Sequence, residues 1–209
     1  MAEAREAALP SVMGGGRPLR GRGRSAAAAD GALVRAAQDG SVEAMEELFR
    51  RYWSGAHRAA YLVVHDAALA EDVAQEAFLS AARSLHRFDR RRPFGPWLHR
   101  IVVNRAIDHA RARVVRREVP AEEVAEPTSD SVRDFSADDE VLGALAALPP
   151  EQRAVVVLRH LLGYTPGEIA RLLRLPRGTV NSRLRRGLDA LAEPLRDAAP
   201  GARRGEARS

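Results

Sequence analysis

The sequence predicts an all-α fold in which two small helical domains are joined by an acidic linker. Apolar residues make up 45% of the 209 residues and aromatic residues only 5%. The chain has no long run of alternating β-branched residues that would predict a strand. A chain of this length is sufficient for two small domains, each with its own core. Charged residues are sorted into blocks, which indicates where one domain ends and the next begins.

The first domain is expected over residues 30–117. Residues 1–29 are rich in Gly, Ala and Arg without helical periodicity, so they predict a disordered extension. Asp30 is positioned to cap a first helix, and Ser41 a longer second one. Helices two to four of this domain are expected over residues 41–64, 67–86 and 97–117. Two prolines and a glycine predict a loop over residues 86–96.

An acidic linker is expected over residues 118–140. This segment has nine acidic residues against one arginine, with prolines and few large apolar residues, which predicts a flexible and extended chain. At about 3.3 Å per residue it could reach roughly 75 Å. A second helical domain follows over residues 141–195, and the Gly-, Ala- and Arg-rich residues 196–209 predict a disordered tail.

Residues 165–188 predict a helix-turn-helix. Thr165 can N-cap the first helix, and Glu168 stands in capping-box position three residues later. The second helix has an apolar stripe and, between Arg177 and Arg186, four arginines and no acid. Such a helix fits a DNA major groove, whereas the alternative is a solvated helix hairpin. The residues expected to face duplex DNA are Arg177, Thr179, Asn181, Ser182, Arg183, Arg185 and Arg186.

Two positions of this motif, Arg174 and Gly187, depart from the usual use of glycine. Arg174 stands in the turn where many such motifs have Gly, so we expect a turn strained by about 1 kcal/mol or differently shaped. Gly187 lowers the intrinsic helicity of the second helix by a similar amount.

A second cationic region precedes the linker. Residues 83–117 contain eleven arginines and two acidic residues. Capture of a single nucleic-acid strand requires cations for its backbone and planar groups to stack on its bases. Arginines and aromatics in and beside the loop, together with one side of the following helix, supply such groups: Phe88, Arg90, Arg91, Arg92, Phe94, Trp97, Arg100, Asn104 and Arg111. Asp108 lies on the same side of that helix. For Phe94 and Trp97, base stacking and core packing are both open interpretations.

The helix over residues 67–86 has a polar face with one apolar residue. Asp72, Gln75, Glu76 and Leu79 share this face, while Val73, Ala74 and Phe78 point elsewhere, toward a core. The motif AEDVAQEAFLSA in this helix, the run PFGPWLHRIVVNRAIDHAR and the terminal helix-turn-helix follow one another in order. This arrangement closely resembles bacterial sigma factors of the extracytoplasmic-function group over roughly residues 30–195.

The resemblance implies a role for each surface. The face of Asp72, Gln75, Glu76 and Leu79 would dock on the core RNA polymerase. The arginine-rich loop and the helix after it would capture the melted nontemplate strand of the minus-10 element, and the helix-turn-helix would bind the minus-35 element as a duplex. The acidic linker would either imitate RNA inside the polymerase or merely repel itself in solvent. The resemblance also implies an anti-sigma factor as a partner.

Several functional classes are not supported by the sequence. It contains no phosphate-binding Gly loop, nucleophile elbow, metal-ligand cluster or convincing carboxylate pair, so we expect no enzyme activity, metal or cofactor. Cysteine is absent, which fits a reducing cytoplasm. No run of apolar residues in the sequence is long enough to predict a helix that crosses a membrane. The alternative functions are a stand-alone helix-turn-helix regulator that binds duplex operators, and a helical interaction protein without a DNA function.

Overall fold

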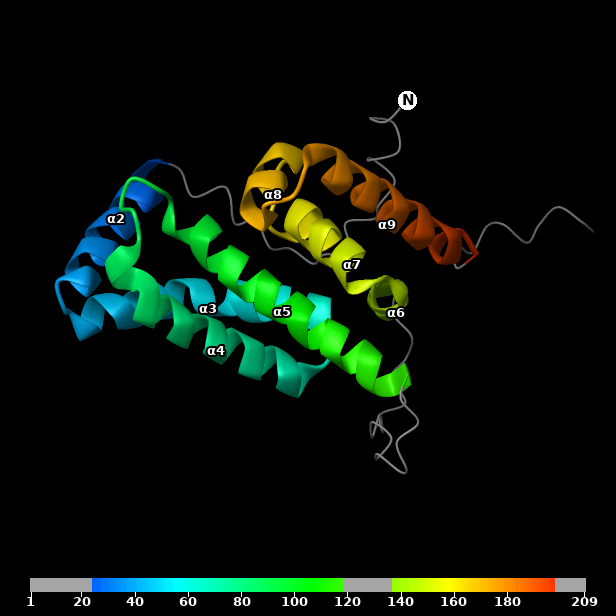
Figure 1. Ribbon diagram of the computed structural model, residues 1–209, viewed down its shortest axis with the longest axis horizontal. Coiled ribbons are helices and arrows are strands. Elements are labelled where there is room, and N and C mark those ends of the chain that lie inside the picture. The colour runs from blue at the N-terminus through cyan, green and yellow to red at the C-terminus, as the bar shows by residue number, and fades with distance from the viewer. Residues whose placement is uncertain (1–23, 119–136, 198–209) are drawn as a thin grey trace, which may run out of the picture.

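The computed structural model describes residues 24–118 and 137–197, and these parts contain helices and connecting turns but no strand. Figure 1 shows α2 to α5 in one layer and α6 to α9 in a second layer packed along it. The elements are α2 (Arg24–Gln38), α3 (Val42–Val64), α4 (Ala67–Ser84), the 3₁₀ turn η2 (Leu85–Arg87), α5 (Phe94–Glu118), α6 (Ala137–Ala147), α7 (Pro150–Val156), the π-helical turn η3 (Val157–Leu161), α8 (Pro166–Leu173) and α9 (Arg177–Asp197). The all-α expectation is confirmed.

Side-chain caps set the beginnings of three helices. The Ser41 hydroxyl accepts a hydrogen bond from the Ala44 amide at 3.1 Å, and the Asp66 carboxylate accepts one from the Leu69 amide at 3.0 Å. Thr165 and Glu168 form the reciprocal capping box that the sequence predicts. These contacts satisfy amides that have no partner within the helix.

The first helix begins earlier than the sequence suggests. Asp30 was expected to cap it, and this was wrong, because α2 already begins at Arg24 and contains Asp30. Residues 26–29 are alanines, which favour a helix, and Asp30 is held by other partners. Its carboxylate accepts from the Tyr52 hydroxyl at 2.6 Å and from Arg51 at 3.1 Å. Disorder was predicted for residues 1–29 and 196–209 and an extended linker for residues 118–140, and these bounds were partly wrong, because residues 24–29, 118, 137–140 and 196–197 belong to helices. The rest of these segments, residues 1–23, 119–136 and 198–209, lies outside the described residues.

Small residues allow the helices of the first layer to pack closely. α3 packs against both α4 and α5, and its contact side is formed largely by alanines and valines. The fully buried alanines of α3 and α4 are Ala56, Ala59, Ala60, Ala70, Ala74 and Ala77. Because a methyl side chain takes little room, the side chains of α5 reach directly onto these helices.

The helix-turn-helix of the second layer accommodates both unusual residues. Arg174 adopts the left-handed conformation at φ 56°, where glycine is common, so the expected strained turn is present. Gly187 has a packing role. A Cβ atom there would lie 2.9 Å from the Val156 Cγ2 atom of α7. The glycine therefore lets α9 approach α7 closely.

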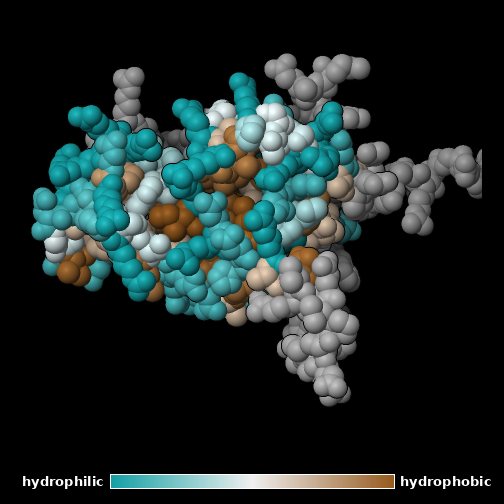
Figure 2. Space-filling view, in the orientation of Figure 1, coloured by the Kyte–Doolittle hydropathy of each residue, from teal (hydrophilic) through white to brown (hydrophobic). Residues whose placement is uncertain are grey.

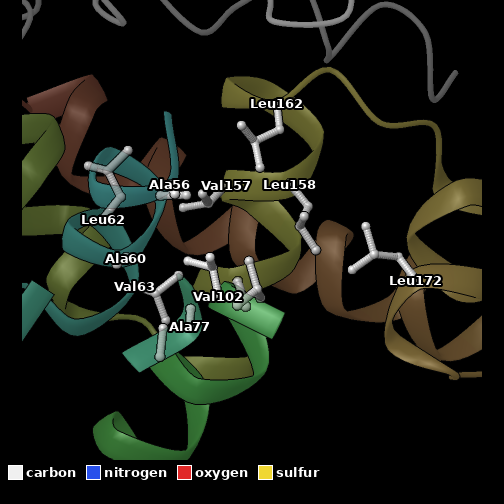
Figure 3. Packing of buried hydrophobic residues seen from close by; sticks show 14 of the residues in the cluster. Ala56, Ala60, Leu62, Val63, Ala77, Val102, Val157, Leu158, Leu162 and Leu172 are labelled. Atoms are coloured by element: carbon white, nitrogen blue, oxygen red, sulfur yellow. The ribbon is translucent and has the colours of Figure 1, made fainter. Parts of the chain in front are cut away.

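One hydrophobic core runs through both layers. Figure 3 shows Val157 and Leu158 of η3 gathered with Ala56 and Val63 of α3 and Val102 of α5. All five residues are fully buried. On the surface, hydrophilic side chains cover most of the face seen in Figure 2, with apolar atoms concentrated in the furrow between the layers. Among the described helices, none has the length and apolarity needed to cross a membrane.

Candidate nucleic-acid interface

The polar face of α4 is exposed as the sequence predicts. Asp72, Gln75 and Leu79 are exposed, and Leu79 retains 57% of its accessible surface despite being apolar. On the opposite side Val73, Ala74 and Phe78 are buried. A lone exposed leucine among polar groups is suited to a contact with another helix.

Glu76 is tied to α5, which the sequence did not indicate. Arg105 of α5 donates to its carboxylate at 2.7 Å, and His109 Nε2 lies 3.6 Å from the same oxygen. Glu76 and Arg105 are both partly exposed, so their attraction is weakened by solvent. The helix that presents the polar face is thus linked to the helix that carries the cationic groove described below.

The arginine-rich loop before α5 is a turn organised by Asp89. The Asp89 carboxylate accepts from the Arg91 amide at 3.0 Å, and its carbonyl accepts from the Arg92 amide at 3.0 Å. Arg90, Arg91 and Arg92 are all exposed. The turn therefore presents three guanidinium groups to solvent beside the start of α5.

The aromatic residues of this region form a cluster. Phe88 and Phe94 are only 7% and 4% exposed, and the Trp97 ring packs on them with centroid separations of 4.6 and 5.5 Å. For Phe94 the structure supports the packing interpretation. Phe88 was expected to contact DNA, but its ring lies in the core and supports Trp97 instead. Trp97 itself is partly exposed.

A groove of about 470 Å³ lies between α4 and α5. Its lining combines an aromatic ring, two arginines, an amide, two hydroxyl groups, an isoleucine and one carboxyl group: Ser80, Ser84, Trp97, Arg100, Ile101, Asn104, Arg105 and Asp108. Burial, together with the positive charges of Arg174 and Arg92, lowers the pKa of the Arg100 guanidinium. Guanidinium groups and an amide beside a partly exposed ring suit a nucleotide of a single strand.

Arg111 differs from the other predicted groups of α5. It points to the second layer, where its Nε donates to the Glu151 carboxylate of α7 at 2.5 Å. Burial works to raise the pKa of Glu151, but a backbone hydrogen bond and the contact with Arg111 together lower it. Arg111 is thus engaged by the second domain in this structure.

The cationic face of α9 lies on the side away from its core contacts. Val180, Leu184 and Leu191 are buried as predicted. The candidate DNA-facing residues that are exposed are Arg177, Asn181, Arg185 and Arg186, whereas Thr179, Ser182 and Arg183 are partly buried. Ser182 donates to the Thr179 carbonyl at 3.0 Å and accepts from Arg186 at 3.3 Å, so its hydroxyl is used within the helix.

Two buried polar contacts between the layers were missed by sequence reasoning. Arg153 of α7 is 7% exposed, and its guanidinium donates to the Val63, Ala146 and Leu148 carbonyls. His99 of α5 is 4% exposed and its Nδ1 lies 2.8 Å from the Tyr164 hydroxyl. A usable signal existed for Arg153, since helical spacing places it on the same side as Val156 and Val157.

Comparisons with known proteins agree with this architecture. Residues 48–117 match the family Sigma-70 region 2, and residues 138–191 match Sigma-70, region 4. The ECF RNA polymerase sigma factor SigM of Mycobacterium tuberculosis (strain H37Rv) is 37% identical over 186 residues, or 89% of this chain and 90% of that protein. The ECF RNA polymerase sigma factor SigW of Bacillus subtilis (strain 168) is 30% identical over 178 residues, or 78% and 95%.

Solved structures show the same fold. CnrH in complex with the cytosolic domain of CnrY has a TM-score of 0.58 and 28% identity, covering 82% of this chain and 99% of that chain. RpoE of Bartonella quintana, in a co-crystal structure with the anti-sigma factor NepR, has a TM-score of 0.59 at 22% identity, covering 74% and 98%. The second likeness supports the fold alone.

The fold and the cationic helix-turn-helix define a helical DNA-binding protein that acts in transcription. The chain belongs to the extracytoplasmic-function group of RNA polymerase sigma factors. It is therefore a factor for promoter-specific transcription initiation with RNA polymerase. Sigma factors are regulatory proteins, and the chemistry of transcription is carried out by the polymerase.

Proposed function

We propose that residues 30–117 bind the core RNA polymerase and the melted minus-10 element, while residues 141–195 bind the minus-35 element as a duplex. The observation that carries this proposal is the presence of two cationic surfaces of different chemistry. The groove between α4 and α5 combines Trp97, Arg100 and Asn104, whereas α9 presents arginines on the exposed side of a helix. The first suits an unstacked base and the second a major groove.

Polymerase docking is assigned to the exposed face of α4. Asp72, Gln75 and Leu79 are accessible there, and Glu76 is held by Arg105 at the border with α5. Because Glu76 has this partner, its carboxylate has a defined position when the polymerase binds. A helix–helix contact on this face of α4 leaves the groove between α4 and α5 open to DNA.

Strand capture is assigned to the groove and the adjoining arginine-rich turn. Arg90, Arg91 and Arg92 provide cations for the strand's phosphates, and Trp97 provides the stacking surface while Phe88 supports it from the core. Binding of an unstacked base by this pocket stabilises the open duplex. The energy for melting then comes from binding and needs no nucleotide hydrolysis.

Duplex recognition is assigned to the exposed side of α9. Arg177, Arg185 and Arg186 are placed for phosphate contacts and Asn181 for a base edge. Promoter elements separated by about two duplex turns lie roughly 70 Å apart. The 18 residues between α5 and α6 can reach roughly 60 Å when extended, and the dimensions of the two domains cover the remaining distance.

The proposal also includes a protein partner and a place of action. CnrH and RpoE were solved in complex with CnrY and with the anti-sigma factor NepR, respectively. By this likeness we propose an anti-sigma factor as a partner of this chain. Its site of action would be the cytoplasm, where bacterial RNA polymerase works. The alternative of a stand-alone regulator assigns no role to the α4 face or to the groove.

The decisive experiment measures promoter opening. Asn104→Ala and Arg91→Ala holoenzymes should still bind core and occupy closed promoter DNA, but opening should fall roughly 5- to 150-fold, since a captured base contributes about 1 to 3 kcal/mol. Permanganate reactivity of promoter thymines measures opening. A template with a pre-melted minus-10 bubble should restore much of the transcription.

Arg58→Ala, at an exposed arginine of α3, is the matched control and should open the promoter normally. Normal opening of linear DNA by the Asn104→Ala and Arg91→Ala holoenzymes would overturn the strand-capture assignment.

A further inference from the structure

The helix α2 precedes the part of the chain that matches Sigma-70 region 2, which begins at residue 48. It nevertheless belongs to the first layer, where it packs against α3, η2 and α5. Figure 1 shows α2 beside the connection between α4 and α5. The arginine-rich turn is part of that connection, so α2 is placed to influence it.

Gln38, the last residue of α2, holds the chain just before the turn. Its Nε2 donates to the Leu85 carbonyl at 2.8 Å and to the Phe88 carbonyl at 2.9 Å. Leu85 begins η2, and Phe88 directly precedes Asp89. One amide group therefore ties the end of α2 to a segment that lies 47 to 50 residues further along the chain.

The Phe88 carbonyl is the last backbone group before the turn begins. The Asp89 side chain and carbonyl then organise the three arginines that follow. Because the peptide unit is planar, a fixed Phe88 carbonyl also fixes the direction of the Asp89 amide. The same contact holds the backbone of Phe88, whose ring lies 4.6 Å from that of Trp97. Gln38 thus acts through the backbone on both the cations and the stacking surface.

α2 also supports the other end of the turn, where α5 begins. The Tyr52 hydroxyl donates to the carboxylate of Asp30, a residue of α2, at 2.6 Å. The Tyr52 ring lies 5.2 Å from that of Phe94, and a Cβ atom at Gly95 would lie 3.0 Å from Tyr52 Cε1. The absence of a side chain at Gly95 therefore lets the first turn of α5 rest on Tyr52. The arginine-rich turn is held on both sides by contacts that lead to α2.

These contacts matter because the turn itself is exposed. Its three arginines have exposed side chains of like charge. A loop that becomes ordered only on binding lowers the affinity for its ligand by the entropy of that ordering. Binding sites work best when their groups are held to within about 0.5 Å. Contacts that fix the turn before DNA arrives therefore increase the affinity for a melted strand.

We propose that α2 is a positioning element for strand capture and that Gln38 is its positioning residue. The Gln38 amide holds the backbone before the arginine-rich turn, so that the three arginines and Trp97 are in place before the melted strand binds. The role in capture rests on the proposed function. The hold of Gln38 on the turn is a property of the free protein and is tested there.

Amide hydrogen exchange of the free full-length chain measures the hold on the turn. The Arg91 and Arg92 amides donate to Asp89, so their exchange reports how often the turn opens. Gln38→Met keeps an unbranched side chain and removes both hydrogen bonds. Exchange at these two amides should become roughly tenfold faster, because one neutral hydrogen bond changes an equilibrium by about 2- to 12-fold. Exchange at the Glu168 amide, in the capping box of α8, should not change.

Promoter opening measures the role in capture. The Gln38→Met holoenzyme should open linear promoter DNA roughly tenfold less, as measured by permanganate reactivity of promoter thymines. It should bind core and closed promoter DNA as the native chain does. Arg35→Met, at an exposed arginine of the same helix, should open the promoter normally. A merely structural role would weaken core binding and opening together, whereas a positioning role lowers opening alone.

Gln38→Glu separates hydrogen bonding from shape. A carboxylate has the shape of the amide but replaces the donor with an oxygen that would face two carbonyl oxygens. The increase in exchange and the loss of opening should therefore be at least as large as in Gln38→Met. Native exchange in both folded variants would overturn the proposal.

Tyr52→Phe covers the case in which both Gln38 variants fail to fold. It removes the hydroxyl that donates to Asp30 and keeps the ring against Phe94. Exchange in the turn should then rise by a smaller factor, about threefold. Unchanged exchange in Tyr52→Phe would overturn the role of α2.

The two measurements distinguish failure of this proposal from failure of the proposed function. Faster exchange in the turn, combined with normal opening by the Gln38→Met holoenzyme, would overturn the positioning role. Normal opening by the Arg91→Ala holoenzyme as well would overturn strand capture by this turn. Exchange in the free variants would still test whether Gln38 holds the turn.

Discussion

The two proposed DNA-binding helices differ in how far their charges are built into the fold. On α5, Arg105, Arg111 and Arg113 each contact a carboxylate from another element, namely Glu76, Glu151 and Asp66. On α9, Arg186 bonds to its own helix at Ser182. Substitutions on α5 should therefore affect both folding and binding, whereas those on the exposed side of α9 should affect binding alone.

The reason lies in the position of each helix. α5 packs against α2, α3, α4, α7 and α8, so most of its surface meets another element. α9 packs against α6, α7 and α8 on one side and leaves the other side to solvent. A helix that is packed on several sides can offer a binding surface only in a groove beside a neighbour.

The largest expected effect concerns His99, which couples α5 to the second layer. Burial lowers its pKa from 6.5 to about 4. The unfolded state therefore binds more protons between these two values, and stability should fall as the pH drops from about 6.5 through 4, by up to about 3 kcal/mol. Urea unfolding of the native chain and of His99→Gln at several pH values measures this.

His99→Gln should be less stable at pH 7 but should lose less stability between pH 6.5 and 4. Burial also lowers the pKa of His65, so only the difference between the two proteins reports on His99. If the two proteins lost stability in parallel as the pH fell, protonation of the buried His99 would not be the cause of the loss.

A comparable loss is expected on the buried side of α9. Gly187→Ala would place a Cβ atom 2.9 Å from Val156 Cγ2, and over-packing of this kind costs about 1 to 3 kcal/mol. This exceeds the gain in helix propensity of about 1 kcal/mol. Thermal unfolding followed by circular dichroism should show a lower Tm, with Gly178→Ala at an exposed position as control. A raised Tm would contradict close packing of α9 on α7.

The face of α4 should show an intermediate effect on polymerase binding. Gln75→Arg combined with Leu79→Asp changes two exposed residues and should weaken core binding by about 2 kcal/mol, or roughly 30-fold. Stability should change little, because neither side chain enters the core. Fluorescence titration of labelled protein with core polymerase measures this, and Arg58→Ala, at an exposed position of α3, is the control. Native affinity in the double variant would remove the docking assignment.

The smallest expected effect concerns single arginines of α9. Arg185→Ala and Arg186→Ala should each weaken duplex binding by about 1 kcal/mol and reduce the salt slope by about one unit per lost phosphate contact. If either reads a guanine, specificity at one base pair should relax by about 1 to 3 kcal/mol instead. Binding at several salt concentrations separates the two results. Reduced stability in these variants would contradict the contrast with α5.

The sequence by itself determined α3, α4, α8 and α9, because their signals are local. Apolar periodicity, the Ser41 cap and the Thr165–Glu168 capping box lie within one or two turns of the positions they control. The left-handed turn at Arg174 was also expected, since the position normally has glycine. The exposed polar face of α4 and the cationic side of α9 followed from the same periodicity.

The tertiary structure alone decided which side chains meet across the fold. The burial of Phe88, the contacts of Asp30 with Tyr52 and Arg51, and the pairing of Arg111 with Glu151 all depend on residues far away in the sequence. Arg153 is the clearest case, because its acceptors include a carbonyl 90 residues away. Periodicity shows which side of a helix is buried, but only the packing of helices shows what that side contacts.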